Sequence, residues 1–228
     1  MTREARRTAA ALAALALGGL AVAWAAGWLG ALGRRLEARQ GGAVRDAIVA
    51  EVFAPVFDDP AFQARAEGMG EAEQQALLFE LARDGLARLP DATLLDRLAL
   101  LRDVVHGGDE RTCATVLVGG APGAAGDLLA ALDEDPLRRW LALSRAAVLA
   151  TLREDPVRQL SPEDAERARA ALLGGLGPAD AERFEAVRHS LAGLSQREAC
   201  ALARATLDAA GRLPAHDRQL VARLLAAG

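Results

Sequence analysis

Hydrophobic residues are distributed along this chain in two ways: one unbroken run near the N-terminus, and helical spacing afterwards. The run from Thr8 to Leu32 contains 25 residues without a charge. About 20 apolar residues are enough for a helix to cross the hydrocarbon core of a bilayer. Trp24 and Trp28 lie near its C-terminal end, where indole rings favour the membrane–water interface. Arginines flank the run on both sides, at positions 3, 6 and 7 before it and 34, 35 and 39 after it. The pattern predicts a transmembrane anchor over residues 8–33.

A cleaved secretory signal is the alternative interpretation of the same residues. Its parts would be the basic start at residues 1–7, the apolar stretch at 8–20, and a small-residue cleavage site at 21–23 or 23–25. The apolar run continues past both sites to Leu32, which favours an uncleaved anchor. A buried helix of a soluble protein is disfavoured by the arginines at both ends. These arginines are equal in number on the two sides, so the positive-inside rule does not decide the orientation. We place the N-terminus in the cytoplasm because the tail that precedes the run is short and basic.

Beyond a short break at residues 40–42, the apolar positions follow the spacing of helices. Apolar residues recur three or four positions apart in six segments: 44–56, 72–89, 91–106, 136–153, 195–211 and 215–225. Short connections between such segments favour antiparallel neighbours. The sequence therefore predicts an all-α chain. It begins with a tail (1–7), one N-terminal transmembrane helix (8–33) and a linker (34–42). An antiparallel multi-helix domain of about eight helices follows over residues 43–228.

Capping residues mark several of the expected helix starts. Asp59 precedes Pro60, and Ser161 precedes a proline and two acids. Ser195 is followed three residues later by Glu198, which is a capping box. Side-chain oxygens at these positions can accept hydrogen bonds from free backbone amides. We therefore interpret both serines as caps rather than nucleophiles. Pro55 is expected to disturb the first helix of the domain near its end.

The charge balance differs between the N-terminal segment and the rest of the chain. All 27 basic side chains are arginine, a bias that resembles high-GC codon usage. Residues 1–39 hold six arginines and two glutamates, and the remainder holds 21 arginines against 29 acids. Phosphate backbones are bound by clustered positive charge. The acidic remainder therefore argues against a nucleic-acid partner.

Two cysteines, Cys113 and Cys200, are the candidates for a disulfide. An even pair in an exported domain typically forms one bond, whereas the same pair in the cytosol would be buried thiols. Neither cysteine stands at a metal-ligand spacing, and His106, His189 and His216 are far apart in the chain. The sequence therefore assigns no metal site.

A glycine-rich stretch at residues 114–126 is the feature closest to a nucleotide-binding motif. A β-branched run there is followed by glycines and then by a helix start, as in the first turn of a dinucleotide-binding fold. No neighbouring strands alternate with helices, Asp127 would stand where a phosphate should lie, and the chain has no lysine. We therefore expect a helix–loop–helix connection and no nucleotide or other cofactor.

Paired carboxylates occur throughout the domain, but they lie beside prolines, glycines and helix ends, where caps and solvated faces explain them. No residue is assigned a catalytic role. The sequence predicts a binding or scaffolding module of the cell envelope, held at the bacterial inner membrane through residues 8–33 with its domain in the periplasm. The expected partner is another envelope protein. The alternative functions are a membrane-anchored hydrolase of cell-wall or peptide substrates, and a domain secreted after signal cleavage.

Overall fold

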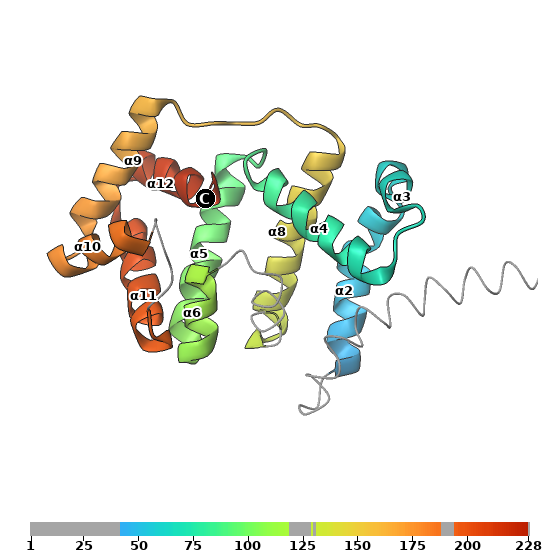
Figure 1. Cartoon of the computed structure of the whole chain (residues 1–228), viewed down its shortest axis with the longest axis horizontal. Helices are drawn as coiled ribbons and strands as arrows, with labels where there is room; N and C mark the ends of the chain where they lie inside the picture. The colour runs from blue at the N-terminus through green and yellow to red at the C-terminus, as the bar shows by residue number, and fades with distance from the viewer. Residues whose placement is uncertain (1–41, 119–128, 130, 188–193, 228) are drawn as a thin grey trace, which may run out of the picture.

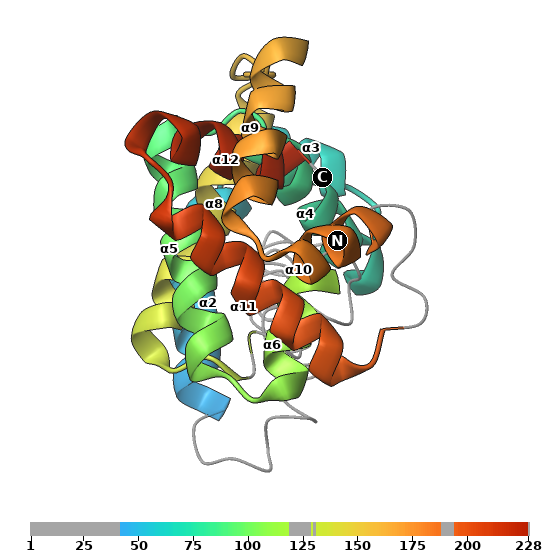
Figure 2. The ribbon, with the colours of Figure 1, turned by 90° about the vertical axis from the view of Figure 1, so that its left-hand side faces the viewer.

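The computed structural model describes residues 42–118, 129, 131–187 and 194–227. In these ranges the chain forms helices and no strand, which confirms the predicted all-α class. The helices are α2 Gly42–Phe57, α3 Pro60–Ala66, α4 Glu71–Leu86, α5 Asp91–Gly107, α6 Glu110–Val118, α8 Glu134–Leu152, α9 Pro162–Gly175, α10 Pro178–Val187, α11 Gln196–Arg212 and α12 Ala215–Ala227. Figures 1 and 2 show their arrangement, with α5 between α11 and α8.

The helices enclose two hydrophobic clusters. One cluster joins α5 and α6 to α9, α11 and α12, through side chains such as Leu98, Leu172 and Leu207. The other joins α2, α3 and α4 to α8, through side chains such as Ile48, Phe62 and Leu141. Helices α5 and α8 contribute residues to both clusters. They therefore bind the two halves of the domain into one body.

The predicted caps are confirmed by hydrogen bonds. The Asp59 carboxylate accepts from the amide of Ala61 at 2.8 Å, and the Ser161 hydroxyl accepts from the amide of Asp164 at 3.0 Å. The Ser195 hydroxyl accepts from the amide of Glu198, whose carboxylate accepts in return from the Ser195 amide at 2.9 Å. Local sequence is sufficient to place these three helix starts.

Three expectations differ from the structure or fall outside it. Ten helices are present in the described ranges rather than about eight, because α6 and α10 are too short to show a clear apolar period. Pro55 lies inside α2, which continues to Phe57. No helix within the described ranges is long and apolar enough to span a bilayer. The expected anchor at residues 8–33 lies outside those ranges, as does most of the linker.

Arg223, a buried arginine of α12, holds the segment that connects α8 and α9 against the rest of the domain. This connection runs along one edge of the molecule from Arg153 to Ser161 (Figure 1). Arg223 of α12 is only 7 % exposed, and its guanidinium pairs with Asp91 at the start of α5. It also donates to the carbonyl oxygens of Leu89 and Arg158, both at 3.0 Å. One side chain thus joins α12, the α4–α5 junction and the connecting segment.

Candidate functional site

The described surface carries a pocket of about 210 Å³ between α5, α11 and the start of α12. Leu95, Leu98 and Ala99 of α5 and Leu207 of α11 form its apolar part. Leu98 and Leu207 also belong to the core cluster that α5 and α11 share, so the pocket lies beside the contact between these two helices. Its size suits one side chain or a small ligand rather than a long polymer.

Charged side chains surround this apolar floor. Asp96 and Arg102 come from α5, and Arg218 comes from α12. Neither Asp96 nor Arg218 has an ion-pair partner among the described residues, whereas Arg102 is paired with Asp208 of α11. The pocket therefore presents one cation and one anion that remain available to a ligand.

Gly211 forms the wall nearest to the two arginines. A Cβ atom at this position would lie 3.4 Å from an Nη atom of Arg102. Arg218 donates from Nη1 to the Gly211 carbonyl oxygen at 3.4 Å. That distance is an ordinary van der Waals contact with the mobile end of a side chain, so an alanine would fit at this position of the pocket wall.

Beside the pocket, Arg102, His106 and Asp208 form a small polar cluster. Arg102 and His106 are one helical turn apart on α5, and Arg102 Nε and His106 Nε2 each lie 2.9 Å from the same Oδ1 of Asp208. Partial burial by itself would raise the pKa of the Asp208 carboxyl, but hydrogen bonds and positive charge from His106 and Arg102 hold that pKa below its ordinary value. Asp208 is therefore a carboxylate at neutral pH and cannot serve as a general acid there.

Asp96 is the carboxyl side chain in the described lining of the pocket, where it stands with Arg102 and Arg218. An acid whose pKa is raised by burial does occur elsewhere, at Asp46 of α2, where Oδ1 has no hydrogen-bond partner. Asp46 does not line the pocket. The acid with the raised pKa and the pocket are therefore separate features of the domain.

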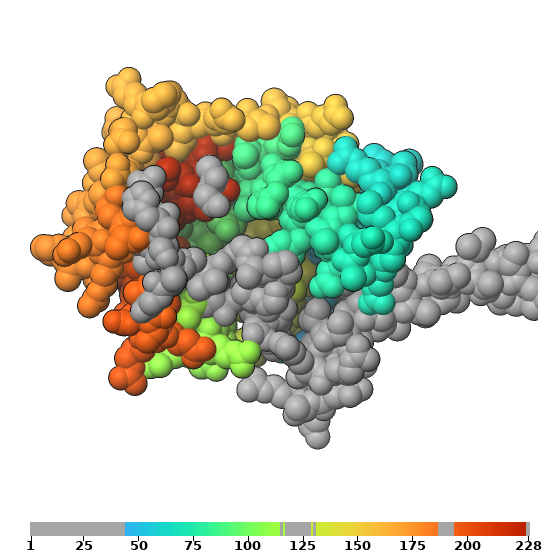
Figure 3. Space-filling view, in the orientation of Figure 1, coloured from blue at the N-terminus to red at the C-terminus, as the bar shows by residue number. Residues whose placement is uncertain are grey.

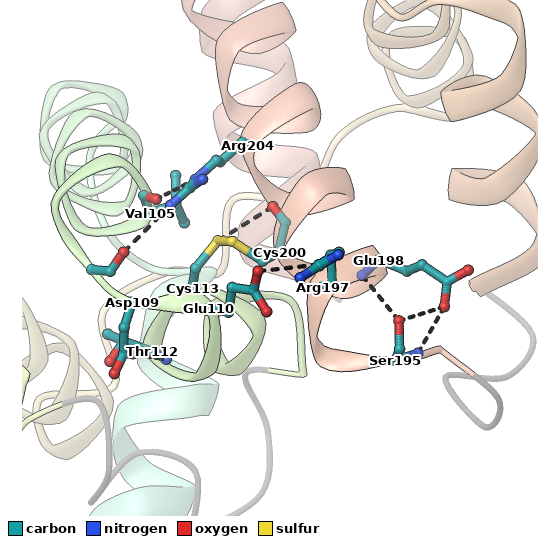
Figure 4. The surroundings of a disulfide bond; sticks show 11 residues. Val105, Asp109, Glu110, Thr112, Cys113, Ser195, Arg197, Glu198, Cys200 and Arg204 are labelled. Carbon is teal, nitrogen blue, oxygen red and sulfur yellow. Dashed lines mark hydrogen bonds and ion pairs between the residues drawn. A yellow bond between two sulfur atoms is a disulfide. The ribbon is translucent and has the colours of Figure 1, made fainter.

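The structure joins Cys113 of α6 to Cys200 of α11 in a disulfide, as predicted (Figure 4). Their Cα atoms are 4.9 Å apart, within the usual range for a bridge, and both residues are buried at 0 % and 2 % exposure. The Cys113 sulfur also lies 3.2 Å from the Cys200 carbonyl oxygen. Since a bonded sulfur carries no proton, we regard this as a packing contact.

Polar contacts near the disulfide hold α11 to α5 and to α6. The Arg204 guanidinium of α11 donates to the carbonyl oxygen of Val105 at 2.7 Å, and Arg197 pairs with Glu110 at 3.2 Å (Figure 4). The α6–α11 contact is the most extensive between helices of the described chain. The cysteines thus form a structural bond inside a packed interface, away from the pocket.

The remaining candidates from the sequence have structural explanations or lie outside the described residues. Thr115–Val118 belongs to the helix α6, so the β-branched run is not a strand. The glycines that follow it, and His189, lie outside the described ranges. His106 lies beside the pocket, whereas His216 is an exposed residue of α12. Among the described residues, no group of His, Cys, Asp or Glu could hold a metal ion.

Sequence reasoning missed the pocket residues. The only local signal was the spacing of Arg102 and His106 on one face of α5, and their partner Asp208 is about a hundred residues away. Comparisons with protein families, with characterised proteins and with solved structures found no match to this chain. The function must therefore be argued from the residues themselves.

Proposed function

We propose that this chain is a membrane-tethered helical binding module of the bacterial cell envelope. Residues 8–33 would hold it in the inner membrane, and the domain from residue 43 onward would act in the periplasm. The pocket between α5, α11 and α12 would receive an apolar side chain of another envelope protein. Secretion after signal cleavage remains the alternative for the N-terminal segment.

The buried disulfide is the observation that carries this proposal. Such bonds form and persist in oxidising compartments and are rare in the cytosol of mesophiles. Cys113 and Cys200 are both inaccessible in the folded domain, which fits a permanent structural bond better than a redox switch. The uncharged run with arginines at both ends supports export through the same membrane.

The chemistry of the pocket supports binding. Its apolar floor would exclude water from an inserted aliphatic side chain, and Arg218 and Asp96 at its edge would orient polar groups of the partner. Charge at the edge of an interface mainly tunes the rate of association. The apolar insertion would therefore supply most of the affinity.

The membrane tether is tested by alkaline carbonate extraction of cells that express the full-length protein. We expect the intact chain to stay in the membrane fraction. A chain recovered with its N-terminus at Trp24 or Ala26 would identify a cleaved signal. Full-length protein in the soluble fraction would contradict both the anchor and the signal.

The pocket is tested in cells that need the protein. Ala99→Trp would fill it, and Ala92→Trp places the same bulk at an exposed position of α5 that does not line the pocket. We expect loss of function in the first variant only, at equal membrane levels. Equal behaviour of the two variants would contradict the pocket as the binding site. If Asp96→Asn, which changes the acid that lines the pocket, abolishes function without lowering the melting temperature, the hydrolase alternative gains over binding.

A further inference from the structure

The pocket between α5, α11 and α12 carries its positive charge at one end. Leu95, Ala99 and Arg102 follow one another on the same face of α5, because they are spaced four and three residues apart. Arg102 reaches the Gly211 wall, where a Cβ atom on that glycine would lie 3.4 Å from Arg102 Nη1. Arg218 of α12 reaches the same wall, since its Nη1 donates to the Gly211 carbonyl oxygen at 3.4 Å. Two guanidinium groups therefore meet at this wall, and the apolar Leu95 lies two helical turns from it along α5.

Of these two cations, Arg218 is the one that is available to a ligand. Arg102 is already paired, because its Nε lies 2.9 Å from Oδ1 of Asp208. Arg218 makes no ion pair within the described part of the chain, and its bond to the Gly211 carbonyl oxygen is long at 3.4 Å. That bond uses one N–H group, and a guanidinium has several. The remaining N–H groups of Arg218 can pair with a carboxylate through two parallel hydrogen bonds.

The acid that lines the pocket is separated from these guanidinium groups. Asp96 and Arg102 are six residues apart on α5, so their Cα atoms are about 9 Å apart along the helix axis. No ion pair joins Asp96 to either arginine of the pocket in the described ranges. Asp96 therefore leaves the charge of Arg218 available to an anion, and it supplies an acceptor further along the pocket.

The helix that carries Arg218 is fixed in place. Figure 3 shows α12 (red) beside α5 (green), and these two helices are in contact. The buried Arg223 of α12 donates from Nε to the carboxylate of Asp91, the first residue of α5, at 2.9 Å. Guanidinium recognition depends on a defined orientation of the N–H groups. The packing of α12 on α5 supplies that orientation before any ligand arrives.

An apolar floor with a cation at one end matches the end of a peptide chain better than its middle. The pocket holds about 210 Å³, which suits one residue. An apolar residue inside a chain brings no charge to the arginines. A C-terminal apolar residue carries a carboxylate on the same Cα atom as its side chain, so one residue can fill the floor and meet the cation.

We propose that the pocket binds the C-terminal residue of the partner protein. Its apolar side chain packs on Leu98 and Leu207, and its carboxylate pairs with Arg218. Asp96 accepts hydrogen bonds from backbone N–H groups of the residues that precede the chain end. This inference rests on the proposed function, because it names the part of the envelope partner that enters the pocket.

Two peptides that differ only at the C-terminus test the carboxylate: acetyl-Ala-Ala-Leu as the free acid and as the amide. Each is titrated by calorimetry at pH 7, where the free acid is ionised, into the full-length protein in detergent. We expect the Kd of the amide to be about fivefold weaker, because it loses a charge-assisted pair at a half-buried arginine.

The outcomes separate this inference from the proposed function. Equal Kd values for acid and amide, with both lost in Ala99→Trp, would overturn the chain-end inference and leave the pocket as an apolar binding site. Free leucine binding more tightly than the acid peptide would also overturn it, in favour of a free amino acid. If neither peptide binds at millimolar concentration, both the inference and the pocket as the binding site are wrong.

One variant pair tests the role of Arg218. Arg218→Gln should weaken the acid peptide about fivefold and leave the amide unchanged. Arg212→Gln is the matched control: Arg212 also donates to a glycine carbonyl oxygen, that of Gly175 at 3.4 Å, and it does not line the pocket. Equal effects of the two substitutions on the acid peptide would contradict pairing with Arg218. If Arg218→Gln does not fold, the comparison of acid and amide on the wild type still decides.

Discussion

Glu154 is the non-glycine residue with a positive φ, 57°, in the described part of the chain. It follows α8, where its amide donates to the carbonyl oxygen of Thr151 at 3.1 Å and the Asp155 amide donates to that of Ala150 at 2.9 Å. These are the two bonds of a Schellman motif, in which glycine usually occupies the left-handed position. A side chain there costs roughly 1 kcal/mol because Cβ approaches the backbone.

Replacing Glu154 by glycine should therefore stabilise the protein. We expect Glu154→Gly to raise the free energy of unfolding by up to about 1 kcal/mol, since relief of this strain exceeds the extra freedom glycine gives the unfolded chain. Urea denaturation measures the change. Glu154→Ala is the control, because alanine keeps the Cβ atom and should give no comparable gain. Equal stabilisation by alanine would show that the carboxylate, rather than the backbone, is responsible.

Residue-scale features were predictable where their partners are close in sequence. The caps at Asp59, Ser161 and Ser195 bond to amides two or three residues away, so their residue types identify them. Glu154 was not predictable, because the left-handed position lacks the glycine that would mark it. The acceptors of Arg223 were also hidden, since Leu89 is more than a hundred positions away.

At the scale of elements, Gly85 sets how closely two helices approach. A Cβ atom at this position of α4 would lie 1.9 Å from the carbonyl oxygen of Ala147 in α8. Such a distance cannot be relieved by rotating a side chain, because the obstacle is backbone. The helices must move apart before any larger residue fits.

Gly85→Ala should lower the free energy of unfolding by about 1–3 kcal/mol through this overpacking, despite the better helix propensity of alanine. Gly174→Ala is the matched control: Gly174 lies near the end of α9, and a Cβ there would meet nothing within 4 Å. The control should be neutral or stabilising by up to about 1 kcal/mol. Thermal unfolding of both variants measures the contrast, and stabilisation of both would contradict the close approach of α4 and α8.

The long helices could be predicted because each presents a sustained apolar face, as α5 does with Leu94, Leu98 and Leu101. The short α6 escaped prediction because Thr115–Val118 is rich in β-branched residues, which favour strands until packing overrides the preference. Packing of α6 against α11 stabilises the helix in spite of this strand preference. The pocket was not predictable at all, since it depends on which helices meet.

For the whole molecule, the disulfide joins two helices whose cysteines are 87 residues apart. The enclosed loop contains α8, α9 and α10, so the bond restricts much of the unfolded chain. In the chain-entropy model, closing a loop of this length stabilises the folded state by roughly 4–5 kcal/mol. That amount is a large fraction of the stability of an ordinary domain.

Reduction of the exported protein should therefore lower the urea concentration at which half of it is unfolded. The control is a Cys113→Ala/Cys200→Ala variant. Its urea midpoint should already be low and should not change when reductant is added. Alanine is the better replacement than serine, because both positions are buried and a hydroxyl there would lack a partner. Thiol titration of the denatured, unreduced protein should detect no free cysteine. Two free thiols in protein taken from the periplasm would contradict the bond. They would also remove the main support for an oxidising compartment, because no other described feature ties the folded domain to one.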